Sequence, residues 1–185
     1  MQNYQIDCLR ENLISLDGKS FGKTFEIIVT RLQDLEKASD TSHDRYCKKT
    51  ENKIEIKSSR ALHKVVQFTE SNIADYLLNK QSAKTLVPDD KKCEYDWDCG
   101  ICQVKTNCFD VLYYAVVFFD KVYIMKITKE QIKADKEIGF SNKQHRDGKM
   151  GQFHINAKNI QHHINNYLYK SLNYQQLIAI LKFQA

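Results

Sequence analysis

Glu55 and Lys57 are the residues whose types and spacing most directly predict chemistry in this chain. Alternating apolar and charged residues predict a β-strand at 53–58, and both of these side chains lie on its charged face. Asp44 lies on a second predicted strand, and a hairpin brings it opposite Glu55. Two neighbouring carboxylates suit a hard divalent cation such as Mg²⁺, and a nearby lysine can orient or deprotonate an attacking water. The pattern therefore predicts metal-dependent hydrolysis of a phosphodiester.

The order of these residues resembles the signature of the PD-(D/E)XK nucleases. Asp44 is separated from the Glu-Ile-Lys-Ser run at 55–58 by ten intervening residues, and His43 stands where the signature carries proline. The segment 21–26 resembles the helix that precedes the core hairpin in that superfamily, and its Glu26 is the helix glutamate that often joins the site. The likeness is clearest to small type II restriction endonucleases of the PvuII-like kind.

This resemblance implies roles for individual residues. Asp44 and Glu55 are the implied Mg²⁺ ligands, with the main-chain carbonyl of Ile56 as a candidate third ligand. Lys57 is implied to position and activate water, and Glu26 to assist from its helix. The resemblance also implies a homodimer that cuts both strands of double-stranded DNA and leaves 5′-phosphate ends, with the protein twofold axis matching a palindromic site.

The apolar periodicity predicts the elements that would hold these residues. Two amphipathic helices come first, separated at Asp17-Gly18, and Glu26 lies at the edge of the second apolar stripe. The unbroken apolar run at 111–119 predicts a strand buried on both faces. The whole pattern predicts an α/β fold with a mixed central β-sheet flanked by helices, in a single domain spanning 1–185. The predicted helices are at 3–16, 21–35, 70–79, after the capping residue Thr128, and at 158–170 and 174–183; the predicted strands are at 43–48, 53–58, 65–68, 111–119, 122–127 and 153–155.

Four cysteines form a second constellation. Cys93, Cys99, Cys102 and Cys108 have the spacing C-x₅-C-x₂-C-x₅-C, which suits tetrahedral structural Zn²⁺. An Fe–S cluster would use the same ligands, and ordinary reduced thiols in a tolerant loop are the remaining alternative. The surrounding sequence has no clear periodicity, so we expect a cysteine-rich insertion near 88–110 that a metal would fold.

A polar segment at 141–152 is the third candidate site. Arginine and lysine suit guanine edges, and asparagine and glutamine suit adenine edges. Arginine and lysine also bind phosphates, whereas a solvated surface loop would have the same composition. The candidate DNA contacts are Asn142, Lys143, Gln144, His145, Arg146, Lys149 and Gln152.

Composition narrows the classes of function. The 185 residues carry a formal net charge of +5, which favours a polyanionic partner such as DNA. No apolar run approaches membrane-spanning length and no secretory signal is evident, so the cytoplasm is expected, with the cysteines reduced or metal-bound. The sequence has no glycine-rich phosphate loop, G-x-S-x-G or H-E-x-x-H motif, so ATPase, serine hydrolase and metalloprotease functions have no support.

These observations predict a Mg²⁺-dependent, sequence-specific endodeoxyribonuclease similar to type II restriction enzymes. Two alternatives stay open. One is a DNA repair or structure-selective nuclease on the same core. The other is a non-catalytic zinc-knuckle protein that binds nucleic acid, which would leave Glu55 and Lys57 without a role.

Overall fold

The computed structural model describes residues 2–64, 86–142 and 150–182. The strand predicted at 65–68 and the helix predicted at 70–79 lie outside the described residues. Among the described residues, no helix is both long and apolar enough to span a membrane.

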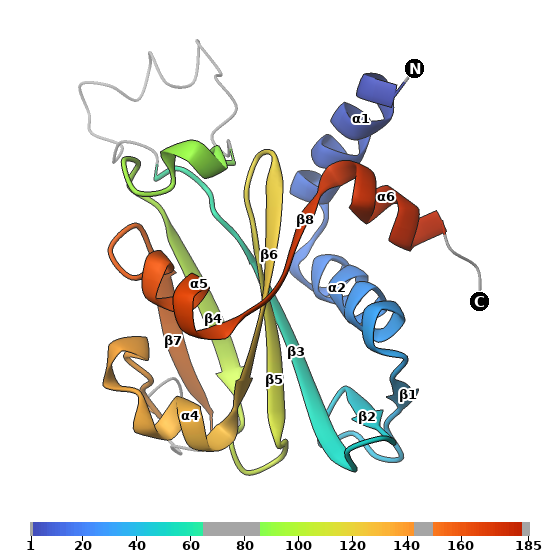
Figure 1. The fold of residues 1–185 in the computed structure, drawn as a ribbon, viewed down its shortest axis with the longest axis vertical. Coiled ribbons are helices and arrows are strands. Elements are labelled where there is room, and N and C mark those ends of the chain that lie inside the picture. The colour runs from blue at the N-terminus through green and yellow to red at the C-terminus, as the bar shows by residue number, and fades with distance from the viewer. Residues whose placement is uncertain (1, 65–85, 143–149, 183–185) are drawn as a thin grey trace.

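A mixed six-stranded sheet forms the centre of the fold, with strand order β1-β2-β3-β5-β6-β8. β3 and β5 run parallel, whereas the other neighbouring strands described in this sheet pair antiparallel. β4 and β7 form a separate antiparallel pair (Figure 1). The strands are β1 (Glu36–Lys37), β2 (Arg45–Cys47), β3 (Asn52–Arg60), β4 (Asp98–Val104), β5 (Val111–Val117), β6 (Lys121–Thr128), β7 (Gly151–Asn156) and β8 (Leu168–Asn173).

Each face of the central sheet is covered by a different layer. In Figure 1 the helices α1, α2 and α6 lie on one side of the sheet, and the β4–β7 pair with α4 and α5 lies on the other. The predicted α/β architecture, a mixed sheet flanked by helices, is thus confirmed. The helices are α1 (Gln2–Ser15), α2 (Gly18–Gln33), α4 (Lys129–Ala134), α5 (Ile160–Tyr167) and α6 (Tyr174–Lys182), with 3₁₀ turns η1 (Asp89–Lys91) and η2 (Lys136–Ile138).

β5 is buried along its whole length, as its apolar run predicts. Its side chains divide between two cores because successive residues of a strand point to opposite faces of a sheet. One core lies under the three helices and the other under β4, β7, α4 and α5. The first core contains Val111, Tyr113, Ala115 and Val117, and the second contains Leu112, Tyr114 and Val116.

Local signals at element ends are confirmed, but one helix boundary is wrong. Thr128 and Gln131 exchange the two hydrogen bonds of a capping box at the start of α4. The helix predicted at 158–170 ends at Tyr167, and the chain continues as β8. The helix stops there because the following residues pair with the edge of β6, a strand far away in the sequence.

The segment expected to be an irregular insertion contains β4 instead. Cys99, Ile101 and Val104 of this strand are buried in the second core, and β4 pairs with β7 from far along the chain. The prediction was wrong because Cys99 acts here as an apolar core residue. Once it is counted as apolar, residues 98–101 alternate as a half-buried strand does.

Candidate active site

The hairpin of β2 and β3 brings Asp44 beside the second strand. The main-chain N–H of Asp44 donates to the carbonyl of Ile54 at 3.0 Å, and its Oδ2 accepts from the N–H of Ile56 at 2.8 Å. The carboxylate is therefore held at the edge of β3 where the pairing with β2 ends. The N–H and C=O of one residue point to the same side of a strand, so the Ile56 carbonyl faces this edge too.

Glu55 and Lys57 lie on the face of β3 that turns toward β4. Their neighbour on that face, Ser59, hydrogen-bonds the Cys99 thiol of β4. The Lys57 Nζ lies 2.6 Å from Glu55 Oε1, and the two side chains are 23% and 9% exposed. A carboxylate this deeply buried is stabilised by a charged partner, which Lys57 supplies.

Burial and neighbouring acidic side chains raise the pKa of both carboxylates. Burial raises the pKa of Asp44, and Glu26 adds to this increase, although the Ile56 N–H and Lys57 lower it. Burial also raises the pKa of Glu55, where Lys57 opposes the increase and Asp44 adds to it. Closely spaced, desolvated carboxylates disfavour their charged forms. A divalent cation would remove this penalty, so the donor set of Asp44, Glu55 and the Ile56 carbonyl fits Mg²⁺.

Glu26 projects from α2 toward the same edge, but cations already hold it. Its Oε2 lies 2.6 Å from Lys23 Nζ and 3.3 Å from Arg45 Nη2. Arg45 is anchored in turn by a 2.8 Å hydrogen bond from its Nε to Thr30 Oγ1. This pairing makes Glu26 an electrostatic neighbour of Asp44 rather than a vacant ligand.

An open cleft of about 640 Å³ gives access to these residues. α2 forms one wall, β4 forms the other, and β3 lies between them. The nearly buried Glu55 does not line the cleft itself but pairs with Lys57, which does. The lining residues include Lys19, Lys23 and Glu26 of α2, Asp44, Ile56 and Lys57 of the hairpin, and Gly100, Ile101, Cys102 and Gln103 of β4.

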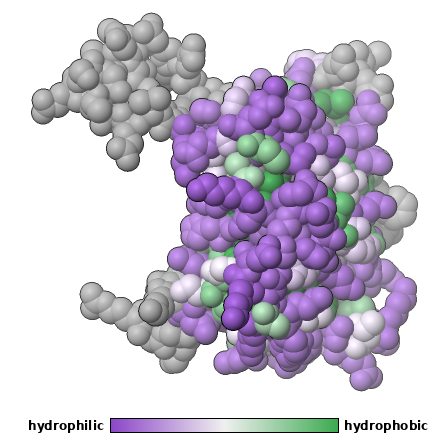
Figure 2. All heavy atoms as spheres, turned by 60° about the vertical axis from the view of Figure 1, so that its left-hand side comes forward, coloured by the Kyte–Doolittle hydropathy of each residue, from purple (hydrophilic) through white to green (hydrophobic). Residues whose placement is uncertain are grey.

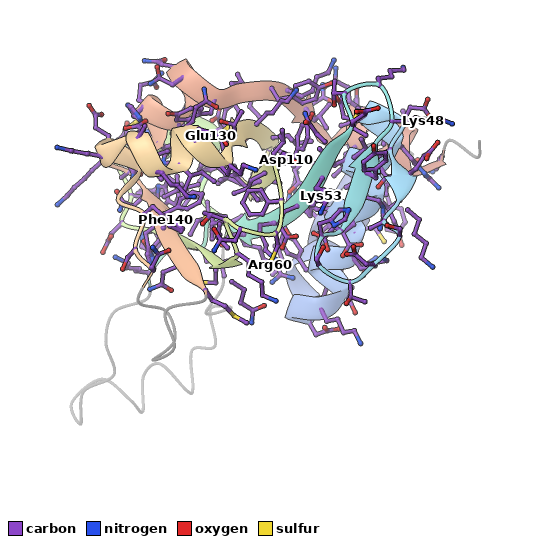
Figure 3. The ribbon with its side chains drawn as sticks, turned by 90° about the horizontal axis from the view of Figure 1, so that it is seen from below. Lys48, Lys53, Arg60, Asp110, Glu130 and Phe140 are labelled. Carbon is purple, nitrogen blue, oxygen red and sulfur yellow. The ribbon has the colours of Figure 1, made fainter. Side chains whose placement is uncertain are left out.

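The base of β3 is held by an acidic residue from outside the hairpin. Asp110 accepts the main-chain N–H of Lys53 at 2.9 Å and the Nζ of Lys129 at 2.7 Å. Figure 3 shows Asp110 beside Lys53 at this end of the strand, whereas Arg60 marks the other end. These bonds join the starts of β3, β5 and α4, and so support the strand that carries Glu55 and Lys57.

The structure does not gather the four cysteines. Cys93 is exposed and Cys99 is fully buried, while Cys102 and Cys108 are partly buried. Burial raises the pKa of the Cys99 thiol to about 12, although Ser59 opposes the increase. Zinc requires thiolates, and strand alternation sends Cys99 and Cys102 to opposite faces of β4.

In the part of the chain that the structure describes, no group of three or more His, Cys, Asp or Glu side chains could hold a metal ion. The zinc site therefore stays a prediction that this arrangement does not favour. A site of two carboxylates and one main-chain carbonyl is of a different kind, because it contains only two such side chains.

Two of the predicted DNA contacts are described. Asn142 is exposed, next to Ser141, which exchanges two main-chain hydrogen bonds of 2.9 Å with Gln152. Gln152 lies on β7, and its Oε1 accepts from the Cys102 thiol of the cleft wall at 3.7 Å. The other five candidates lie outside the described residues: Lys143, Gln144, His145, Arg146 and Lys149.

The sequence interpretation missed several residues of the cleft. Lys23 precedes Glu26 by three residues, a spacing at which side chains on a helix form ion pairs, so this pair could have been predicted. Arg45 follows Asp44 directly, but nothing local indicates that it reaches Glu26. The contribution of β4 could not be found locally, because it depends on how β4 packs against β3.

No family model matches this chain, and no curated protein matches it either. The function proposed below is therefore inferred from the geometry of the cleft.

Proposed function

We propose that this chain is a Mg²⁺-dependent endodeoxyribonuclease of the type II restriction kind, and that its mixed sheet belongs to a restriction-endonuclease-like fold. One observation carries the proposal. Asp44, Glu55 and Lys57 meet at the edge of β3 beside an open cleft, and burial raises the pKa of both carboxylates, a penalty that a bound cation would offset.

Each of these side chains has a task in phosphodiester hydrolysis. Asp44, Glu55 and the Ile56 carbonyl would hold the metal. Bound Mg²⁺ supplies Lewis acidity to the scissile phosphate and lowers the pKa of water. Lys57 positions the attacking water and stabilises the negative charge that develops on the phosphate. In-line attack with departure of the 3′ oxygen leaves a 5′-phosphate.

The walls of the cleft suit a polyanion. Lys19 and Lys23 line it from α2, and the whole chain carries a net charge of +5. Lysines beside a cleft concentrate a negatively charged backbone and orient it without reading its sequence. Glu26, neutralised by Lys23 and Arg45, keeps α2 and the hairpin together at this point. We further propose a homodimer, so that two such clefts cut the two strands.

Digestion of a sequenced plasmid tests the proposal. We expect discrete fragments with ligatable 5′-phosphate ends in Mg²⁺ and none with the Glu55→Ala variant. Lys53→Ala is the matched control, because Lys53 lies on the same face of the same strand but points to solvent. Cleavage only of branched substrates would favour a repair nuclease. Mg²⁺-independent binding without any cleavage would overturn the proposal and favour a nucleic-acid-binding module.

A further inference from the structure

The β4–β7 pair has one apolar face and one polar face. Ile101 on β4 and Phe153 and Ile155 on β7 are buried in the core. The opposite face carries Asp98, Gly100 and Cys102 from β4 with Gln152, His154 and Asn156 from β7, all partly or fully exposed. The side of the molecule that carries this pair comes forward in Figure 2 and is mainly hydrophilic.

This polar face is continuous with the catalytic cleft. Gly100 and Cys102 line the cleft together with Lys57. The Cys102 thiol reaches Gln152 at 3.7 Å, and Gly100 stands directly opposite His154 in the register of the two strands. A Cβ at Gly100 would lie 3.2 Å from Cys102 Sγ, a tight contact, and 3.7 Å from the His154 ring, so both side chains lie close above Gly100.

His154 is held in one orientation. Its Nδ1 lies 2.7 Å from Asp98 Oδ2, although the imidazole is exposed. A carboxylate on Nδ1 fixes the proton on that nitrogen and turns Nε2 outward as the group that meets a ligand. Asn156 is engaged differently, because its Oδ1 accepts from the N–H of Lys158 and shapes the turn after β7. A thiol is only a weak donor, so its 3.7 Å contact with Gln152 Oε1 leaves Gln152 able to meet a ligand together with His154.

The spacing of these two side chains matches duplex DNA. A two-stranded β-ribbon fits into the major groove. Alternate side chains on one strand are roughly 6.7 Å apart, which is about two steps of the 3.4 Å rise between base pairs. A glutamine amide suits the N6 and N7 edge of adenine, and an imidazole Nε2 suits an exocyclic amino group.

We propose that the polar face of β4–β7 reads base edges of the target DNA in the major groove, with Gln152 and His154 as the specificity-determining residues. Asp98 is a positioning residue that acts through His154. The inference rests on the proposed nuclease function for the identity of the substrate, but it concerns recognition and not catalysis.

Selection of duplexes from a pool with a randomised centre, in Ca²⁺, tests this recognition independently of cleavage. We expect the wild-type chain to enrich one sequence. Gln152→Ala and His154→Ala should each lower the ratio of affinities for that sequence and a scrambled duplex by roughly 10- to 100-fold, the scale of one base contact. Binding to the scrambled duplex should not change, because the phosphate contacts remain. Asp98→Ala should reproduce the His154→Ala loss of sequence preference, and Asp98→Asn should restore part of it.

Gln161→Ala on α5 is the matched control, because Gln161 is exposed and does not line the cleft. His154→Gln and Gln152→Glu replace the alanine variants if either fails to fold. An unchanged affinity ratio in folded variants of both positions, or no enrichment by the wild-type chain, would overturn the inference. If the wild-type chain enriches a sequence through these residues but does not cut it in Mg²⁺, the nuclease proposal fails and the recognition surface stands.

Discussion

The β2–β3 hairpin and β4 both carry residue spacings that are typical of metal sites, yet only the hairpin brings its residues together. Asp44 and Glu55 come from two chain segments joined by a tight turn, and the pairing of those segments sets the carboxylates side by side. Cys99 and Cys102 share one strand, whose alternation separates them. A spacing pattern thus indicates a site only when the secondary structure it falls on turns its residues to one point.

The largest effect should come from the hairpin. Asp44→Ala, Glu55→Ala and Lys57→Ala should each lower cleavage by at least ~100-fold, the scale of losing a metal ligand or a proton-transfer group. Rates are measured on a plasmid under single-turnover conditions, and DNA binding in Ca²⁺ should persist in each variant. A normal cleavage rate for Glu55→Ala would place the active site elsewhere.

The choice of metal should follow the oxygen ligands of the hairpin. Mg²⁺ or Mn²⁺ should support cleavage, whereas Ca²⁺ should support binding without turnover, because its loose coordination positions water poorly. The test compares initial rates in each metal after chelation and dialysis. Full activity in excess EDTA would show that cleavage needs no metal, and Asp44 and Glu55 would then have no role as metal ligands.

Serine substitutions of Cys99 and Cys93 should have different effects on stability, because Cys99 is buried in β4 and Cys93 is exposed. Cys99→Ser should lower the free energy of unfolding by about 1–3 kcal/mol, because it buries a more polar group in the apolar core, where Ser59 is its hydrogen-bonding neighbour. Cys93→Ser should change it by less than about 0.5 kcal/mol, since Cys93 is exposed. Denaturant unfolding measures both, alongside elemental analysis. Stoichiometric zinc, lost equally in the two variants, would show instead that the four thiols form one site.

The smallest effect concerns the stability of the hairpin site. Because burial raises the pKa of Asp44 in the folded state, ionisation of this group opposes folding as pH rises through that pKa. Asp44→Asn should therefore raise the melting temperature at pH 7 by a few degrees. The gain should vanish below about pH 4, where Asp44 is protonated in both states. Added Mg²⁺ should stabilise the wild-type chain more than the variant, and equal stabilisation would argue against a metal ligand at Asp44.

Much of this fold follows from local patterns. The capping box at Thr128, the buried run of β5 and the hairpin that joins Asp44 to Glu55 each depend on residues close together in the chain. Such features are set by side-chain periodicity, by turn residues and by hydrogen bonds between near neighbours. The sequence alone was therefore sufficient to predict a mixed sheet flanked by helices and the carboxylate–lysine group on its β2–β3 hairpin.

Other features depend on segments that are far apart in the sequence. β4 pairs with β7, β8 completes the edge of β6, and the cleft forms because α2 and β4 stand on opposite sides of β3. No local signal reports these pairings, since the stability of each strand comes from a partner that the local sequence does not contain. The tertiary structure therefore decided that Cys99 belongs to the core, that Glu26 is held by Arg45, and that Gln152 and His154 face outward beside the cleft.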